Sequence, residues 1–184
     1  WVRSVVGRFG GSGYSALGID LLSAQGGTAA FKDPAEATAA LGKIPPDQFI
    51  ADLRSGLDEL QRRAPGMKLA MIGFCFGGGI ANLLATRLPD LKAAIPFYGS
   101  PPPLANVPNI KAELLIHYAG NDARINATWP DYKAALDKAG VRYQAFVYDG
   151  VEHGFNNDTT PRFDKAAADL AWARSLTLLR QSTR

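Results

Sequence analysis

Strand-sized apolar runs alternate with helical segments along the sequence, and no other feature constrains the fold as strongly. The run from Lys68 to Phe76 is apolar on both faces, as a strand covered by helices on either side must be. Such alternation predicts an α/β fold whose mainly parallel sheet is flanked by helices on both faces. The predicted strands are residues 14–22, 68–76, 92–98, 112–118 and 142–148, and the predicted helices are residues 45–64, 80–88, 132–139 and 163–179.

Length and composition are those of one globular domain. The chain has 184 residues, of which 47% are hydrophobic and 20% are charged. Its apolar runs are too short to span a membrane, and the three prolines at 101–103 are too few to form an interdomain linker. We therefore expect a single domain over residues 1–184, with no membrane as a partner.

Charge and cysteine usage exclude several classes of function. The 20 Lys and Arg residues exceed the 17 Asp and Glu residues by only three charges and are scattered, so nucleic acid is not an expected partner. One cysteine, Cys75, and two distant histidines, His117 and His153, provide neither a disulfide nor the ligands of a structural zinc ion. The first residues show no secretory signal pattern. This favours the cytoplasm, but the compartment stays open because a mature or fragmentary chain would look the same.

Three reactive side chains follow three of the predicted strands. Cys75 follows the strand that ends at Phe74, Asp122 lies in the later loop AGND, and His153 lies in the loop DGVEHGF. Because the carboxyl ends of parallel strands share one edge of the sheet, we expect the thiol, carboxylate and imidazole to meet there. Their order along the chain is the nucleophile, acid, base order of an α/β-hydrolase.

The residues around Cys75 match the nucleophile-elbow pattern G-x-S-x-G, with sulfur in place of oxygen. A nucleophile at the apex of this turn is held in strained backbone geometry. We therefore expect that Gly73 and Gly77 must lack side chains so that strand and helix can pass closely. The turn also directs the backbone N–H of Phe76, at a helix N-terminus, toward a developing oxyanion. One turn is thus predicted to hold both the nucleophile and an oxyanion donor.

Each candidate also has a plain structural interpretation. Cys75 can be a small buried hydrophobe, Asp122 a turn residue and His153 a solvated loop residue. The glycine-framed turn and the matching loops favour the reactive interpretation. His117 lies inside a predicted strand, and we expect a hydrogen-bonded sheet residue there. Four aromatic residues are candidates for a substrate pocket, with core packing as the alternative: Tyr98, Tyr118, Trp129 and Phe155.

With these motifs in place, the sequence resembles the dienelactone hydrolase (carboxymethylenebutenolidase) family of α/β-hydrolases. The matching pieces are GFCFGG around Cys75, LLIHYAGNDARIN around Asp122, EHGFNND around His153 and the upstream GIDLLSAQGG, and the similarity covers essentially the whole chain. The resemblance implies that Cys75 is the nucleophile, His153 the general base and then acid, and Asp122 the carboxylate that orients His153. It also implies hydrolysis of a small ester or lactone through a thioester, without cofactor or metal.

The chain departs from the family pattern in two places. Family members begin with strands and a His-Glu loop, which supplies a second oxyanion N–H and a Glu beside the thiol. These precede Trp1, so we expect an N-terminally incomplete domain. Members that act on dienelactone hold its carboxylate with two arginines, whose places are taken here by Ala24 and approximately Asn157. Because paired arginines make a carboxylate site selective, the resemblance supports hydrolysis but leaves a dienelactone substrate open.

Two other functions stay open at this point. A nucleotide-binding domain would also show a strand, a Gly-rich turn and a helix, but residues 73–79 match neither G-x-G-x-x-G nor a P-loop. A catalytically idle or truncated member of the same fold, acting as a binding or structural protein, is the second alternative.

Overall fold

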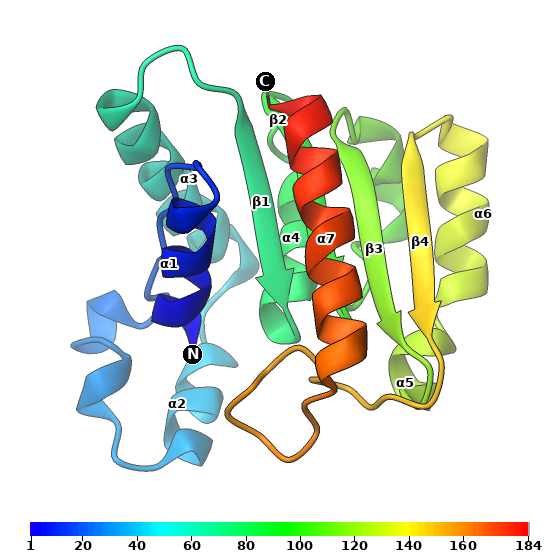
Figure 1. The fold of residues 1–184 in the computed structure, drawn as a ribbon. Coiled ribbons are helices and arrows are strands. Elements are labelled where there is room, and N and C mark those ends of the chain that lie inside the picture. The colour runs from blue at the N-terminus through cyan, green and yellow to red at the C-terminus, as the bar shows by residue number, and fades with distance from the viewer. Residues whose placement is uncertain (184) are drawn as a thin grey trace. The chain divides into compact units, whose positions relative to one another are not determined.

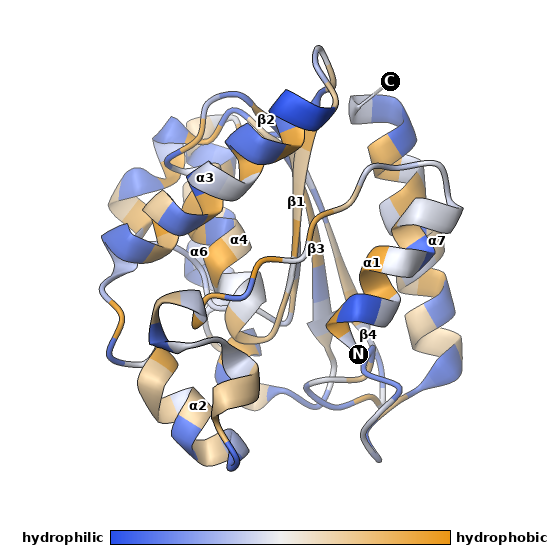
Figure 2. Cartoon of the chain, turned by 90° about the vertical axis from the view of Figure 1, so that its left-hand side faces the viewer, coloured by the Kyte–Doolittle hydropathy of each residue, from blue (hydrophilic) through white to orange (hydrophobic). Residues whose placement is uncertain are grey.

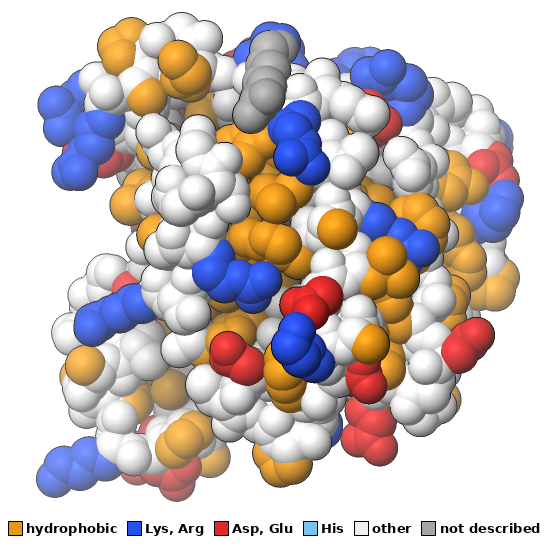
Figure 3. Space-filling model, viewed as in Figure 1, with side chains coloured by type: hydrophobic (Ala, Val, Ile, Leu, Met, Phe, Trp, Pro, Cys, Tyr) orange, Lys and Arg blue, Asp and Glu red, His pale blue; other side chains and the backbone are white. Residues whose placement is uncertain are grey.

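The computed structural model describes residues 1–183, which form two compact units. The first unit is Trp1–Met67, and the second begins at Lys68. Every strand of the described chain belongs to the second unit. Lys and Arg side chains lie scattered over the face seen in Figure 3. Within residues 1–183, no helix combines the length and apolar character needed to cross a bilayer.

The second unit is built on four parallel strands in the order β1-β2-β3-β4 (Figure 1). In the register of these strands, Phe97 is paired with both Phe74 and His117. Because the strands run in one direction, their carboxyl ends lie along the same edge of the sheet. The strands are β1 (Leu69–Phe74), β2 (Leu91–Phe97), β3 (Glu113–Ala119) and β4 (Tyr143–Tyr148), which confirms the four strands predicted for this part of the sequence.

Helices cover both faces of this sheet. Helices α4 and α6 lie on one side, and α7 lies on the other (Figures 1 and 2). The helices of this unit are α4 (Phe76–Ala85), α5 (Ala123–Asn126), α6 (Trp129–Ala139) and α7 (Lys165–Ser182), with the short 3-10 helix η3 (Leu104–Asn109). The predicted α/β fold, with a parallel sheet flanked by helices on both faces, is confirmed.

The two central strands are apolar because both of their faces are covered. Ile95 of β2 and Leu114 of β3 have no exposed surface, and Ile116 has 1%. Such burial is the main favourable contribution to folding, at about 25 cal/mol for each Å² of apolar surface removed from water. The carboxyl ends of β2 and β3 are therefore fixed points to which loops can attach functional side chains.

The first unit is helical and contains α1 (Val2–Gly11), α2 (Pro34–Leu41), α3 (Pro46–Arg63) and the 3-10 helices η1 (Ser23–Gln25) and η2 (Thr28–Ala30). Helix α3 is confirmed: it begins after Pro45, and Arg62 and Arg63 in its last turn both pair with Glu59. Helices α1 and α2 are not among the helices expected from the sequence pattern. Three glycines weaken the helical pattern of α1, and α2 is short.

The strand predicted over residues 14–22 is wrong. Residues 14–20 have no regular secondary structure, and the chain then turns around Asp20. The Asp20 carboxylate accepts hydrogen bonds from the backbone N–H groups of Leu22 (3.0 Å) and Thr28 (2.7 Å), and the bond from the Thr28 N–H lowers the pKa of Asp20. A strand needs a neighbouring strand to form hydrogen bonds with its backbone groups, and residues 1–67 contain no strand. A short apolar run does not by itself reveal this lack of a partner.

His117 is a buried, hydrogen-bonded residue of β3, as the sequence predicts. Its Nδ1 lies 2.9 Å from the Tyr148 hydroxyl, and its Nε2 lies 3.2 Å from the Ser175 hydroxyl of α7. Burial lowers the pKa of His117 from an ordinary 6.5 to about 3, and the positive charge of Arg174 acts in the same direction. His117 is therefore neutral at physiological pH and joins β3, β4 and α7.

Neutral His117 makes the stability of the protein sensitive to acid. Its pKa is lower in the folded than in the unfolded chain, so the unfolded chain binds more protons between pH 6.5 and about 3. Stability from this residue is complete above pH 6.5 and should fall by up to about 1.4 kcal/mol per pH unit across that interval. Urea denaturation from pH 7 to pH 4 should show a weaker pH dependence for His117→Gln than for the wild type or for His153→Gln. Equal slopes in all three proteins would contradict this assignment.

Candidate active site

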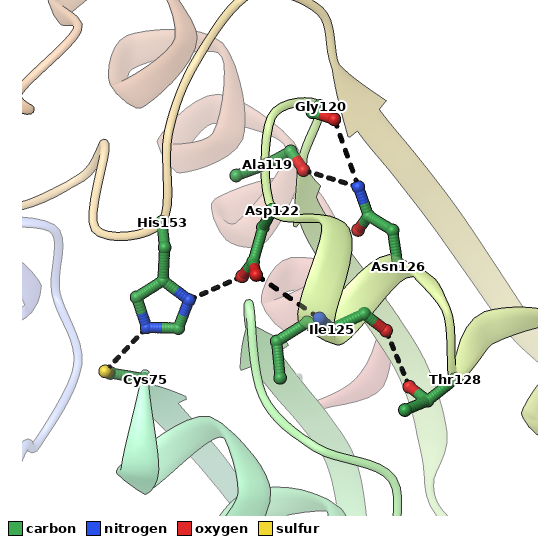
Figure 4. Close-up of polar contacts among 8 residues, drawn as sticks. All are labelled: Cys75, Ala119, Gly120, Asp122, Ile125, Asn126, Thr128 and His153. Carbon is green, nitrogen blue, oxygen red and sulfur yellow. Dashed lines mark hydrogen bonds and ion pairs between the residues drawn. The ribbon is translucent and has the colours of Figure 1, made fainter.

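Cys75, Asp122 and His153 meet at the carboxyl edge of the sheet. They follow β1, β3 and β4 respectively. The Cys75 Sγ lies 2.7 Å from the Nε2 of His153, and the Nδ1 of the same ring lies 2.5 Å from the Oδ2 of Asp122 (Figure 4). One imidazole thus bridges the thiol and the carboxylate, although Cys75 and His153 are 78 positions apart in the chain. The structure brings together the three side chains singled out in the sequence.

Cys75 sits at a sharp turn between β1 and α4. Its backbone has φ 59° and ψ −119°, a conformation that residues other than glycine rarely adopt. Its N–H donates to the Phe97 carbonyl of β2 (3.0 Å), and its own carbonyl accepts from the N–H groups of Gly78 and Gly79. These bonds join the turn to both the neighbouring strand and the helix. The side chain is exposed, so the thiol is accessible rather than sealed in the core.

The glycines around this turn have unequal roles. A Cβ on Gly73 would lie 1.8 Å from the carbonyl oxygen of Gly77, so no side chain fits there. A Cβ on Gly77 would meet no atom within 4 Å, and the expectation that Gly77 must lack a side chain is wrong. The backbone of Gly77 makes the close contact with Gly73, while a side chain on Gly77 itself would point into open space. Gly78 is the second crowded position, because its Cβ would lie 2.4 Å from the Phe97 carbonyl oxygen and 3.0 Å from the Cα of Gly99.

Asp122 is held by the helix that it begins. It is the N-cap residue of α5, and its Oδ1 accepts the N–H of Ile125 at 3.2 Å while Oδ2 faces His153. Asn126, at the end of α5, donates from Nδ2 to the carbonyls of Ala119 (2.8 Å) and Gly120 (3.2 Å), which ties the helix to the end of β3 (Figure 4). Asn126 is not among the residues singled out in the sequence, where its only signal is its spacing of four from Asp122.

His153 is half-buried and packs against the ring of Tyr98. Its side chain is 22% exposed, against 6% for Asp122. The ring of Tyr98 lies 4.8 Å from the imidazole, and Phe155 packs against Tyr98 at 5.5 Å. Tyr98 has φ 37°, and burial raises its pKa, with the nearby Cys75 charge acting in the same direction. Tyr98 therefore supports His153 as a neutral phenol.

The four aromatic pocket candidates fall into two groups. Tyr98 lies beside His153 and Phe155 packs against Tyr98, each with at most 1% exposed surface. Tyr118 instead packs against Trp129 at 5.2 Å, and Trp129 also contacts Tyr132 and Tyr143. A pocket role for any of the four stays a prediction.

The two positions where the family pattern has arginines carry no charge. Ala24 belongs to the first unit, where it lines a cavity of about 710 Å³ with residues such as Phe31 and Ile44. The Asn157 Oδ1 accepts the backbone N–H of Thr159 (3.0 Å) and its hydroxyl (2.7 Å), so Asn157 shapes the loop after His153. No group of three or more metal-ligating side chains occurs among residues 1–183.

The chemistry open to this arrangement is proton transfer between sulfur and imidazole. A thiolate is a far better nucleophile than a thiol, and a neighbouring imidazole that accepts the proton raises its population. A carboxylate on the other ring nitrogen fixes the ring orientation and stabilises the imidazolium that forms. The start of α4 places a helix N-terminus beside the sulfur, which also favours negative charge.

Comparison with known proteins finds relatives over almost the whole chain. The model of the Dienelactone hydrolase family matches residues 2–183. A "Putative carboxymethylenebutenolidase" of Escherichia coli (strain K12) is 31% identical over 193 residues, covering 98% of this chain and 71% of that protein. Another of that name, from Saccharolobus solfataricus, is 41% identical over 115 residues, covering 62% of this chain and 44% of that protein.

Solved structures agree with the fold. The crystal structure named as a putative dienelactone hydrolase from Klebsiella pneumoniae has a TM-score of 0.79 and 28% sequence identity. The match covers 88% of this chain and 72% of that chain.

The unequal crowding of the glycines can be tested by stability. Gly73→Ala should lower the free energy of unfolding by about 3 kcal/mol or more, because its methyl group would overlap the Gly77 carbonyl. Gly77→Ala should change it by less than about 1 kcal/mol, since the new methyl group meets open space. Urea denaturation of the two variants measures both values. Similar losses of stability in the two proteins would show that the close contact between Gly73 and the Gly77 carbonyl does not determine the effect of a substitution.

Proposed function

Because the chain belongs to the dienelactone hydrolase family, we propose that it hydrolyses small esters or lactones with Cys75 as nucleophile, His153 as general base and acid, and Asp122 as the carboxylate that orients His153. The observation that carries the proposal is the continuous contact from the Cys75 Sγ through the His153 ring to the Asp122 carboxylate. The chain spans 44% of the Saccharolobus protein and 71% of the Escherichia protein, so the activity is proposed for this chain in its own right.

The first half of the reaction forms a thioester. His153 accepts the thiol proton at Nε2 as the Cys75 sulfur attacks the carbonyl carbon, and the carbonyl oxygen becomes an oxyanion. When the carbon–oxygen bond breaks, the imidazolium returns the proton to the leaving oxygen. In a lactone this oxygen stays tethered to the acyl group, so acylation opens the ring and releases nothing.

The second half consumes water. His153 accepts a proton from a water molecule as that water attacks the thioester carbonyl, and a second tetrahedral oxyanion forms. The carbon–sulfur bond then breaks, sulfur leaves as a thiolate that regains the proton, and the carboxylic acid is released. Asp122 remains ionised throughout and stabilises the imidazolium in both halves.

We assign the binding of the oxyanion to the backbone N–H at the start of α4. Phe76 is the first residue of this helix, and its backbone N–H follows the nucleophile directly. Donors placed where the negative charge develops are usually the largest single contribution to such catalysis. The strained turn at Cys75 supports this assignment, because it fixes the sulfur and the first helical N–H relative to each other.

The nucleophile is tested by substitution of Cys75. Cys75→Ala should lower turnover of an activated phenyl ester by about 10³-fold or more, because it removes the attacking atom while the fold stays intact. Cys75→Ser should be slow rather than inactive, since a hydroxyl is far less ionised than a thiol. Spectrophotometric assays with circular dichroism as a check on folding make the comparison. Unchanged turnover in Cys75→Ala would reject the mechanism.

Iodoacetamide alkylation measured together with ester turnover separates an enzyme from an idle member of the fold. An active enzyme should show both ester turnover and rapid alkylation of Cys75 near neutral pH. Mass spectrometry measures the alkylation. Rapid alkylation without turnover of any ester or lactone would favour the idle alternative.

Asp122 is tested by removing its charge. Asp122→Asn should lower kcat by about 10²- to 10⁴-fold and leave KM nearly unchanged, because the amide no longer stabilises the imidazolium. Asp158→Asn is the matched control, since Asp158 is exposed in the loop after His153. Steady-state kinetics on the same ester distinguish the two variants. Comparable kcat values for both would mean that Asp122 is only a helix cap.

A further inference from the structure

The segment between β4 and His153 is held mainly by one residue of another loop. Asn121 donates from its backbone N–H to the Val151 carbonyl (2.9 Å) and from its side-chain Nδ2 to the Gly150 carbonyl (3.1 Å). These are the two hydrogen bonds described for residues 149–151. Two donors of a single residue thus bind two successive carbonyls of the chain that leads to His153.

The two loops approach too closely for side chains to separate them. The Gly120 N–H donates to the Tyr148 carbonyl (2.8 Å), and a Cβ on Gly120 would lie only 2.7 Å from that same oxygen. Gly150 has φ 75°, a conformation that suits glycine, and its carbonyl accepts the Asn121 Nδ2 of the neighbouring loop. The β3–α5 loop and the β4–His153 loop are therefore joined backbone to backbone beside the site.

Asn121 and Asp122 connect the same two loops at adjacent positions. Asp122 contacts the imidazole of His153, while Asn121 holds the segment just before it. Two backbone bonds, from Gly120 and Asn121, already join the loops, and the side-chain bond of Asn121 adds a third point at Gly150, three residues before His153. A third point restricts the movement that the two backbone bonds still allow to the segment leading to His153. We propose that Asn121 is a positioning residue for the proposed hydrolysis, on which this inference rests: its side-chain amide sets the orientation of His153 toward Cys75.

The chemistry of the link requires a donor. Gly150 presents a carbonyl oxygen, which accepts hydrogen bonds only, so an aspartate of the same size would place an acceptor against an acceptor. An alanine would leave the backbone bond to Val151 in place and remove only the side-chain bond. A glutamine keeps the amide donor on a longer stem, and because Asn121 is exposed, there is room for that stem.

The experiment measures turnover and thiol reactivity in a series at position 121. Relative to the wild type, Asn121→Ala should lower kcat for an activated phenyl ester about five- to tenfold with KM unchanged, as expected for loss of one such bond. Asn121→Asp should lose at least as much, and Asn121→Gln should recover most of the activity. The rate of Cys75 alkylation by iodoacetamide at pH 7 should follow the same order. Melting temperatures should stay close to that of the wild type.

Asn109 supplies the matched controls. It is an exposed asparagine of the same unit, for which no side-chain hydrogen bond is described among residues 1–183. Asn109→Ala and Asn109→Asp should leave kcat, KM and alkylation unchanged, which separates the effect of position 121 from the general effects of truncation or added charge.

Two outcomes would overturn the positioning role. Wild-type kcat and alkylation rates in both Asn121→Ala and Asn121→Asp would show that the side-chain bond is dispensable. Equal losses in Asn121→Gln and Asn121→Asp would show that the amide donor is not what matters. If the wild-type chain turns over no ester, the proposed hydrolysis fails, and the alkylation rates alone still decide whether Asn121 aligns His153 with the thiol. If Asn121→Ala does not fold, the comparison of Gln with Asp decides the same question.

Discussion

The contact between the backbones of β1 and α4 is the constraint on which the rest of the site depends. Strand and helix meet at Gly73 and Gly77 at a separation that excludes a single methyl group, and the chain can turn there only by holding Cys75 at positive φ. The hydrogen bond from Cys75 to Phe97 adds the neighbouring strand to this contact. The position of the Cys75 backbone, from which the sulfur extends, is thus determined by main-chain packing.

A gradient of exposure accompanies the chain of contacts from sulfur to carboxylate. Cys75 is exposed, His153 is half-buried, and Asp122 is almost fully buried with its second oxygen satisfied by the N–H of Ile125. A buried carboxylate is tolerated only when hydrogen bonds replace the lost water, which the cap of α5 provides. The Asp122 carboxylate is therefore shielded and fixed, while the Cys75 thiol is open to solvent.

Much of this site could be predicted from the sequence because its information is local. The glycine-framed turn, the order of thiol, carboxylate and imidazole, and the apolar strands before them all lie in short, readable segments. The residues that the sequence did not reveal, Asn121 and Asn126, act through hydrogen bonds to backbone carbonyls. Asn121 contributes through carbonyls of another loop, which any residue provides, and nothing in its local sequence identifies that partner.

The two wrong predictions, the strand over residues 14–22 and the crowding at Gly77, also arise because they depend on contacts in three dimensions. Residues 14–22 look like a strand, but strand formation depends on a neighbour that an apolar pattern cannot show. Gly77 fits the motif, yet only three-dimensional packing reveals that the crowding falls on Gly73 and Gly78. The extent of the domain also depends on contacts that the sequence does not show. These contacts divide the described chain after Met67, and a single domain over residues 1–184 stays a prediction.

The turn at Cys75 has an evolutionary consequence. Because glycines at 73 and 78 and the backbone of Phe97 shape it, its geometry makes no demand on the element carried by the side chain at its apex. Cysteine and serine codons differ by a single-nucleotide change, so a lineage with this scaffold can exchange thiol for hydroxyl chemistry without passing through a misfolded ancestor. Selection on reactivity can then act separately from selection on architecture.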